Sequence, residues 1–188
     1  MANVYSYGHR NPQRLVFDNQ GRLFQSEHGS NNDDEINLIQ KGGNYGFPKV
    51  QGYCDQRSEK SFCREHNVIE PLVAFTPCLG VSGMAFFDHP SIPEWQNSIL
   101  VATLKSGSGD VGQRLLQCKL DLSGQQIEEV NHHFSFSFGR LRDVLVTDEG
   151  GIYLCTSNQE TNANGMEIVT EQDDMMIEIK SRITKTSI

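Results

Sequence analysis

Two short apolar runs joined by a polar, glycine-containing turn occur twice in this chain. Residues 15–24 form the first copy, with Asp18-Asn19-Gln20-Gly21 as its turn, and residues 145–154 form the second. Asn and Gly tolerate the positive φ of tight hairpins, so each copy predicts strand, turn and strand. The copies lie 130 residues apart, which also aligns Arg10 with Arg140. This offset is about three units of 43 residues, a period typical of propeller blades.

Further short strands are expected between the two copies. Apolar or alternating runs predict them at 35–40, 84–88, 98–104, 114–120 and 126–134. No segment shows a sustained helical period with caps, so helix should be scarce, and the polar residues 55–70 and 158–174 are interpreted as long loops. The sequence therefore predicts a single all-β domain over residues 1–188, a β-propeller of about four blades.

About four blades would leave a propeller unclosed, with its sheet edges and central channel exposed. We therefore expect a fragment, a half ring completed by another chain, or a truncated reading frame. A monomer in solution would exclude the self-closing half ring.

Charge and hydropathy exclude several classes of partner. The net charge is -8 at pH 7, so attraction to nucleic acid or to an anionic membrane is not expected. No apolar run approaches the roughly 18 residues that span a bilayer, and the first residues have no signal-peptide pattern. We expect no nucleic-acid partner and no membrane insertion.

The five cysteines have no spacing typical of a zinc site. Cys118 and Cys155 lie in strand-like runs and are expected to be buried packing residues. Cys54 and Cys63 flank a polar loop and either form a disulfide, if the protein is exported, or remain thiols; the sequence leaves both open.

Four polar, glycine-rich clusters lie within the first fifty-five residues and indicate a site built from loops. They are Tyr7-Gly8-His9-Arg10-Asn11-Pro12-Gln13, Glu27-His28-Gly29, Asp33-Asp34-Glu35-Ile36-Asn37-Leu38-Ile39 and Gly42-Gly43-Asn44-Tyr45-Gly46-Phe47-Pro48. With residues 82–87, 93–95, 100–105 and 139–144, they make the chain resemble the soluble quinoprotein glucose dehydrogenases and the related aldose sugar and sorbosone dehydrogenases. That resemblance implies a six-bladed propeller that binds pyrroloquinoline quinone (PQQ) and calcium.

The resemblance assigns cofactor-binding residues. It implies that Lys105, Arg140 and Arg142 pair with the carboxylates and quinone edge of PQQ, and that Arg10 and Asn11 contact its reactive face. The residues agree with this, because a tricarboxylated quinone in an acidic protein needs converging cations. Taken singly, each cation would instead be a solvated surface charge.

The resemblance also assigns metal ligands. The backbone carbonyls of Gly29 and Ser30 are expected to hold the active-site calcium, and Asp34 to orient the catalytic base. A second calcium region is expected at Glu35, Tyr45, Gln51, Tyr53 and Asp55, where the alternative is a structured turn with an aromatic anchor.

The catalytic histidine of the resembled family lies upstream of the Gly-His-Arg-Asn-Pro-Gln motif, in blades that this chain does not contain. The six histidines of this chain, His9 included, are therefore interpreted as structural.

The implied activity is PQQ- and calcium-dependent oxidation of an aldose at its anomeric carbon to the lactone. This chain would supply the cofactor cradle and metal loop without the general base, and so be inactive alone. The alternative is a non-catalytic propeller fragment that binds a protein or a glycan. A homodimer or a partner chain that completes the ring, and a periplasmic or secreted location as in the family, are further expectations.

Overall fold

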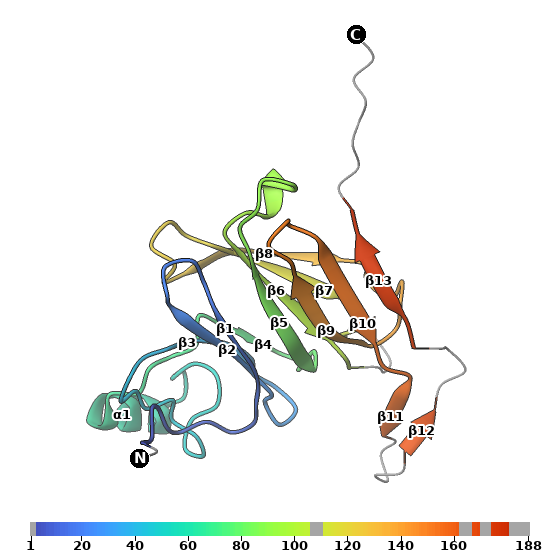
Figure 1. The fold of residues 1–188 in the computed structure, drawn as a ribbon. Coiled ribbons are helices and arrows are strands. Elements are labelled where there is room, and N and C mark those ends of the chain that lie inside the picture. Colours follow the sequence, from blue (N-terminus) through green and yellow to red (C-terminus); the bar gives the residue numbers. More distant parts are fainter. Residues whose placement is uncertain (1–2, 106–110, 162–166, 170–173, 181–188) are drawn as a thin grey trace.

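The computed structural model describes residues 3–105, 111–161, 167–169 and 174–180, and its strands form antiparallel sheets (Figure 1). The first four-stranded sheet contains β1 (Pro12–Phe17), β2 (Leu23–Glu27), β3 (Asp34–Ile39) and β4 (Val73–Phe75). The second contains β5 (Val81–Phe87), β6 (Ser98–Thr103), β7 (Leu115–Leu120) and β8 (Ile127–His133). The third has the order β13 (Met176–Ile179), β10 (Ile152–Thr156) and β9 (Leu141–Val146), and β11 (Gln159–Thr161) pairs with β12 (Glu167–Val169). A short 3₁₀ helix, η1 (Pro93–Trp95), precedes β6.

The three larger sheets lie face to face, as propeller blades do (Figure 1). The middle sheet supplies both cores, because alternate side chains of a strand point to opposite faces. Met84 of β5 packs with Phe24 and Ile36 of the first sheet, and Ala85 and Phe87 pack toward the third. The expected all-β propeller architecture with unclosed sheets is confirmed.

Each predicted strand between residues 35 and 134 has a counterpart in β3 and β5 to β8. The 43-residue unit is wrong, however, because the two copies of the hairpin pattern belong to the first and third sheets and are therefore two blades apart. The first blade is longer than 43 residues because the segment between β3 and β4 contains the helix at residues 57–66. The two hairpins have the same register at the turn, where Phe17 pairs with Leu23 and Val146 with Ile152. Structurally equivalent positions are therefore 129 residues apart, one fewer than the sequence pattern indicated.

The interpretation of residues 55–70 as a long loop is wrong, because α1 (Arg57–His66) lies there. Its first turn is capped by Glu59, whose Oε2 accepts the backbone N–H of Gln56 at 3.1 Å, and Asn67 ends it in the left-handed conformation. No residue of α1 is buried, so it has no apolar stripe to detect. The Cys54–Cys63 disulfide ties the helix to the preceding loop.

The interpretation of residues 158–174 as a loop is also wrong where the structure describes them, because β11 and β12 lie there; residues 162–166 and 170–173 are outside the described part. Cys118 is buried as expected, whereas Cys155 is only half-buried. Within the described residues, no helix is long and apolar enough to cross a membrane.

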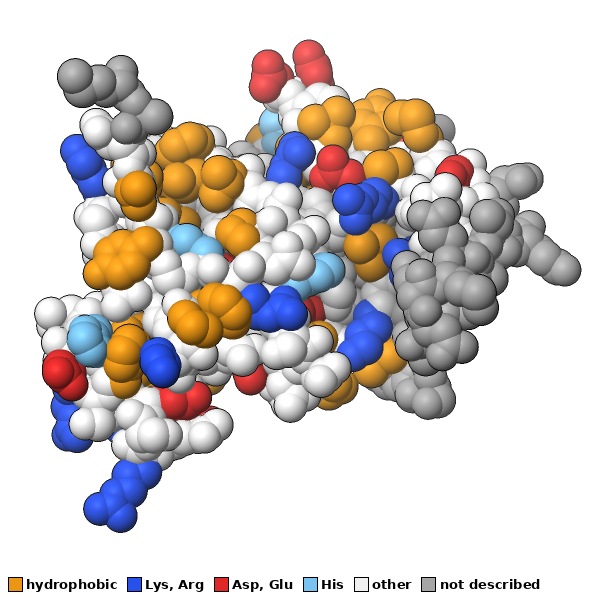
Figure 2. Space-filling view, turned by 90° about the horizontal axis from the view of Figure 1, so that it is seen from below, with side chains coloured by type: hydrophobic (Ala, Val, Ile, Leu, Met, Phe, Trp, Pro, Cys, Tyr) orange, Lys and Arg blue, Asp and Glu red, His pale blue; other side chains and the backbone are white. Residues whose placement is uncertain are grey.

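The two outer blades each have a face that no other described sheet covers. On the first sheet, Leu15 is 57% and Phe17 63% exposed. On the third, Leu145 is 58% and Met176 82% exposed, beside a shallow apolar groove that also includes Tyr153. Seen from below, Lys, Arg and His side chains lie near the middle of the molecule between apolar patches (Figure 2).

Candidate functional site

The loop after β2 is held in place by one buried carboxylate, that of Asp34. Its Oδ1 accepts the backbone N–H of Gly29 at 2.9 Å. Its Oδ2 accepts the backbone N–H groups at the start of the second sheet, from Leu79 (2.8 Å), Gly80 (2.6 Å) and Val81 (3.2 Å). Asp34 is 1% exposed, and its four backbone partners satisfy the acceptor oxygens that burial would otherwise leave unpaired. It therefore fixes the loop against the neighbouring blade.

A second buried carboxylate, Glu27 at the end of β2, holds the segment that carries Arg10. Its Oε1 accepts the backbone N–H of Arg10 and, at 3.2 Å, that of Asn11. Its Oε2 lies 3.1 Å from Nδ1 of His9, whose ring stacks on Tyr45 with 4.6 Å between centroids. His9 is thus packed and hydrogen-bonded within this segment, and its structural role stays a prediction.

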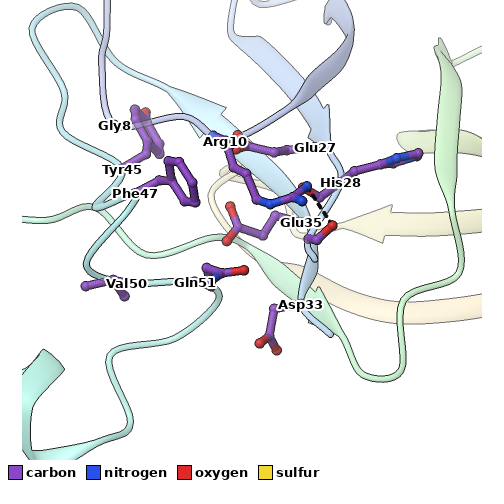
Figure 3. Close-up of a pocket in the computed structure, with 11 residues that line it drawn as sticks. Gly8, Arg10, Glu27, His28, Asp33, Glu35, Tyr45, Phe47, Val50 and Gln51 are labelled. Atoms are coloured by element: carbon purple, nitrogen blue, oxygen red, sulfur yellow. Dashed lines mark hydrogen bonds between the residues drawn. The ribbon is translucent and has the colours of Figure 1, made fainter. Parts of the chain in front are cut away.

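The guanidinium of Arg10 lies across the backbone of the loop. Its Nη1 donates to the carbonyl of His28 at 2.9 Å and to that of Gly29 at 2.8 Å. Figure 3 shows the side chain extended over these carbonyls, with Glu27 behind it and Glu35 nearby. The carbonyl of Gly29, one of the two predicted calcium ligands, therefore already accepts a cationic group.

An open hollow of about 260 Å³ gathers the predicted cofactor residues that lie at the junction of the three sheets. Its lining includes Gly29, Ser30, Asp34, Lys105 and Arg140, together with His28, Cys78, Gly80 and Leu104. Arg140 Nη1 donates to the carbonyl of Leu104 at 3.2 Å, which places its guanidinium beside Lys105. Lys105, Arg140 and the loop after β2, which come from three different sheets, thus share one surface.

Three other predicted cofactor residues lie outside that lining. Arg10 adjoins it through Gly29. Asn11 accepts the backbone N–H of His28 at 3.1 Å through its carbonyl and the amide of Gln13 at 3.0 Å through its side chain. Arg142 is exposed, and its carbonyl accepts the Ser82 hydroxyl at 2.7 Å.

Cys78 is a residue of the hollow that sequence reasoning missed. Burial, followed by its hydrogen bond to Asp34 and the charge of that carboxylate, raises the pKa of its thiol to about 12. The thiol is therefore neutral at ordinary pH and is a poor nucleophile. Its position after a cis Thr76-Pro77 peptide carries no motif that would have identified it.

The predicted second calcium region is only partly brought together. Glu35, Tyr45 and Gln51 line a small pocket that has room for about one water-sized group, with Arg10, Asp33 and others (Figure 3). Tyr53 is 42% exposed and, like Asp55, lies outside this lining. The hydroxyl of Ser30 donates to Gln51 Oε1 at 2.6 Å, so the pocket and the hollow share a wall.

Glu35 is the most perturbed group of that pocket. Its Oε1 accepts the backbone N–H of Gly52 at 2.7 Å, and its Oε2 accepts the Asn37 amide at 2.9 Å. Burial, with smaller repulsion from Glu27 and Asp33, raises its pKa to about 7. Tyr45, whose hydroxyl donates to the carbonyl of Leu38 at 2.7 Å, also has a pKa raised by burial. Among the described residues, no three His, Cys, Asp or Glu side chains are grouped as metal ligands, so backbone oxygens would have to complete either site.

A family model described as Glucose / Sorbosone dehydrogenase matches residues 1–169. The chain belongs to this family. Within it, the chain is 29% identical over 160 residues to aldose sugar dehydrogenase YliI of Escherichia coli strain K12, a match that covers 82% of this chain and 41% of that protein. A 55-residue stretch, 29% of this chain and 12% of the relative, is 62% identical to quinoprotein glucose dehydrogenase B of Acinetobacter calcoaceticus.

The fold agrees with a solved member of the family. The PQQ-bound aldose sugar dehydrogenase of Streptomyces coelicolor has a TM-score of 0.71 and 29% sequence identity, over 94% of this chain and 45% of that one. The chain therefore spans less than half the length of these two proteins.

Proposed function

We propose that this chain forms the cofactor cradle and metal loop of a PQQ-dependent sugar dehydrogenase that oxidises an aldose at its anomeric carbon to the lactone. The observation that supports this most is the hollow in which Lys105 and Arg140 lie with Gly29 and Ser30. A relative of 29% identity is described as PQQ-bound, and another as a quinoprotein glucose dehydrogenase. When bound, PQQ would accept the hydride of the sugar.

The cations of the hollow would bind the carboxylates of PQQ. Lys105 offers a compact charge and Arg140 a planar fork, and both lie on a protein that is otherwise acidic. Arg142 would join them from its exposed position at the start of β9, and Arg10 and Asn11 would approach the quinone from the other side of the metal loop. The Asp34 anchor would keep the loop fixed relative to Lys105, which lies on the neighbouring blade.

We propose calcium as the metal, with the carbonyls of Gly29 and Ser30 as ligands. The residues fit a hard cation, because the Gly29 carbonyl already accepts a positively charged donor from Arg10 at 2.8 Å. A second calcium is proposed at Glu35, Tyr45 and Gln51 because they line one pocket; backbone oxygens would have to complete the site, and Tyr53 and Asp55 would have to move to reach it.

The described histidines offer no general base in the hollow other than His28, whose ring belongs to the metal loop. We propose that the base comes from outside these residues, so that the chain alone would bind the quinone and turn over poorly. A general base contributes about 10²- to 10⁴-fold in rate. The two open blade faces support a homodimer or a partner chain that completes the ring.

The Cys54–Cys63 disulfide supports a periplasmic or secreted location, because disulfides persist in oxidising compartments.

The test is calorimetric titration of the folded chain with PQQ, in calcium and then in EDTA. We expect calcium-dependent binding that is lost in Lys105→Gln and Arg140→Gln. Arg64→Gln in the exposed helix α1 changes the net charge equally, outside the hollow, and should bind as the wild type does. Absence of PQQ binding by the folded wild-type chain, or equal loss in Arg64→Gln, would refute the proposed cradle.

A further inference from the structure

The side chain of Arg10 makes few hydrogen bonds to the rest of the protein. Among the described residues, its hydrogen bonds are those from Nη1 to the carbonyls of His28 and Gly29. The residue is exposed, and its backbone N–H is separately held by the buried Glu27. The guanidinium can therefore leave the two carbonyls without disturbing the backbone position from which it extends.

One of these two carbonyls, that of Gly29, is also a proposed calcium ligand, together with the next carbonyl along the loop, that of Ser30. Consecutive carbonyl oxygens that converge on one donor present their lone pairs to one region of space, which is how hard cations are held by backbone. The carboxylates of Glu27, Asp33 and Glu35 line the adjoining pocket with Arg10, and a positive charge there reduces the repulsion among them. A guanidinium and a divalent cation cannot both bind the Gly29 carbonyl oxygen, because the two cations repel each other and use the same lone pairs.

We propose that Arg10 is a tethered cation that competes with the metal for the Gly29 carbonyl. Metal binding displaces the guanidinium, and the freed side chain becomes available to an anionic ligand on the neighbouring surface, since Gly29 lines both the small pocket and the hollow. This inference rests on the proposed calcium and quinone function and adds a coupling between the two. Each ligand then strengthens the binding of the other, because linkage is reciprocal.

The first experiment is calcium titration of the full chain without quinone, by calorimetry and by terbium luminescence. We expect Arg10→Gln to bind calcium about tenfold more tightly than the wild type, within the range usual for coupled sites. Arg10→Lys should stay near the wild type, because it keeps a tethered cation. Arg14→Gln is the matched control, since Arg14 is an exposed arginine of β1 whose Nη1 lies 3.8 Å from Asp143 Oδ2.

The second experiment measures PQQ affinity with and without calcium. Arg10→Gln should bind PQQ more weakly and should lose the calcium-dependent gain, whereas a purely structural role of Arg10 would weaken calcium and PQQ binding together. In the wild-type chain, calcium should also shift the Arg10 side-chain Nε–H signal in ¹⁵N spectra. This last measurement needs no variant and tests displacement even if Arg10→Gln folds poorly.

The outcomes distinguish the calcium proposal from the proposed competition by Arg10. Calcium binding by the wild type with unchanged or weaker binding by Arg10→Gln, or an Arg10 signal that calcium does not move, overturns the competition alone. No calcium binding by either protein overturns the calcium proposal and the competition with it. Binding by Arg10→Gln that exceeds the wild type, with Arg14→Gln unchanged, supports both.

Discussion

Replacing Gly83 by alanine should force the second and third blades apart. A Cβ added at Gly83 would lie 1.9 Å from Oδ1 and 2.4 Å from Cα of Asp143 on β9. The carboxylate could rotate away, but the Cα belongs to the backbone of a neighbouring strand. That contact is more than about 1 Å shorter than an ordinary carbon–carbon contact of about 3.5–4.0 Å, so β5 and β9 must separate.

The size of the effect follows from this geometry. Overpacking a tight interface costs about 1–3 kcal/mol, and a clash with backbone belongs at the upper end. For a chain of this length, each kcal/mol lowers the melting temperature by about 2–4 °C, so we expect Gly83→Ala to melt roughly 6–12 °C lower. The loss should come with exposure of the core that Ala85, Phe87 and Leu141 form.

Thermal and urea unfolding, followed by circular dichroism, would measure this change. Gly151→Ala is the matched control: its added Cβ would meet only side-chain atoms, at 3.2 Å or more. It should unfold within about 1 kcal/mol of the wild type. A Gly83→Ala protein that melts together with Gly151→Ala would show that the two sheets do not approach as closely as described.

Three further predictions concern the disulfide and two perturbed groups. Cys54→Ser should lower the free energy of unfolding in urea by about 2–3 kcal/mol, because the bond closes a short loop; reductant should do the same to the wild type and nothing to the variant. Because folding raises the pKa of Glu35 from 4.5 to about 7, the folded state holds its proton more tightly and the wild type should lose about 3 kcal/mol of stability in EDTA between pH 4.5 and pH 7. Glu35→Gln should abolish that loss, and an unchanged slope would refute the assignment. Iodoacetamide should label Cys78 about 10³-fold more slowly at pH 8 than an exposed thiol, and mass spectrometry showing rapid labelling in the folded chain would contradict its burial beside Asp34.

Much of the fold was predictable, because β-strands are recognisable from alternating apolar and polar residues and from the turn residues between them. The hairpin pattern at residues 15–24 and the strands from β5 to β8 are of this kind. The helix α1 was not predictable, since none of its residues is buried and its stability depends on a capping box and a disulfide. The blade period was misjudged because connections of unequal length separate equivalent strands, and a repeated pattern alone cannot count the blades between its copies.

The candidate site was also predictable only in part. Lys105, Arg140, Gly29 and Ser30 were chosen from motifs, and the structure brings them to one hollow. Cys78 was missed because only the tertiary packing of the first two sheets places it there. The contact of Arg10 with two carbonyls could not be predicted from the sequence either, because the direction of a backbone carbonyl depends on the local conformation of the loop.

The single carboxylate of Asp34 has a further consequence. It accepts amide hydrogens from the loop after β2 and from the start of the next blade, so it fixes the two relative to each other. A molecule that rests between Ser30 and Lys105 therefore meets two surfaces whose spacing is already set before it binds. A change in the angle between the first two sheets would have to break hydrogen bonds of Asp34, and it would change the width of the hollow at the same time.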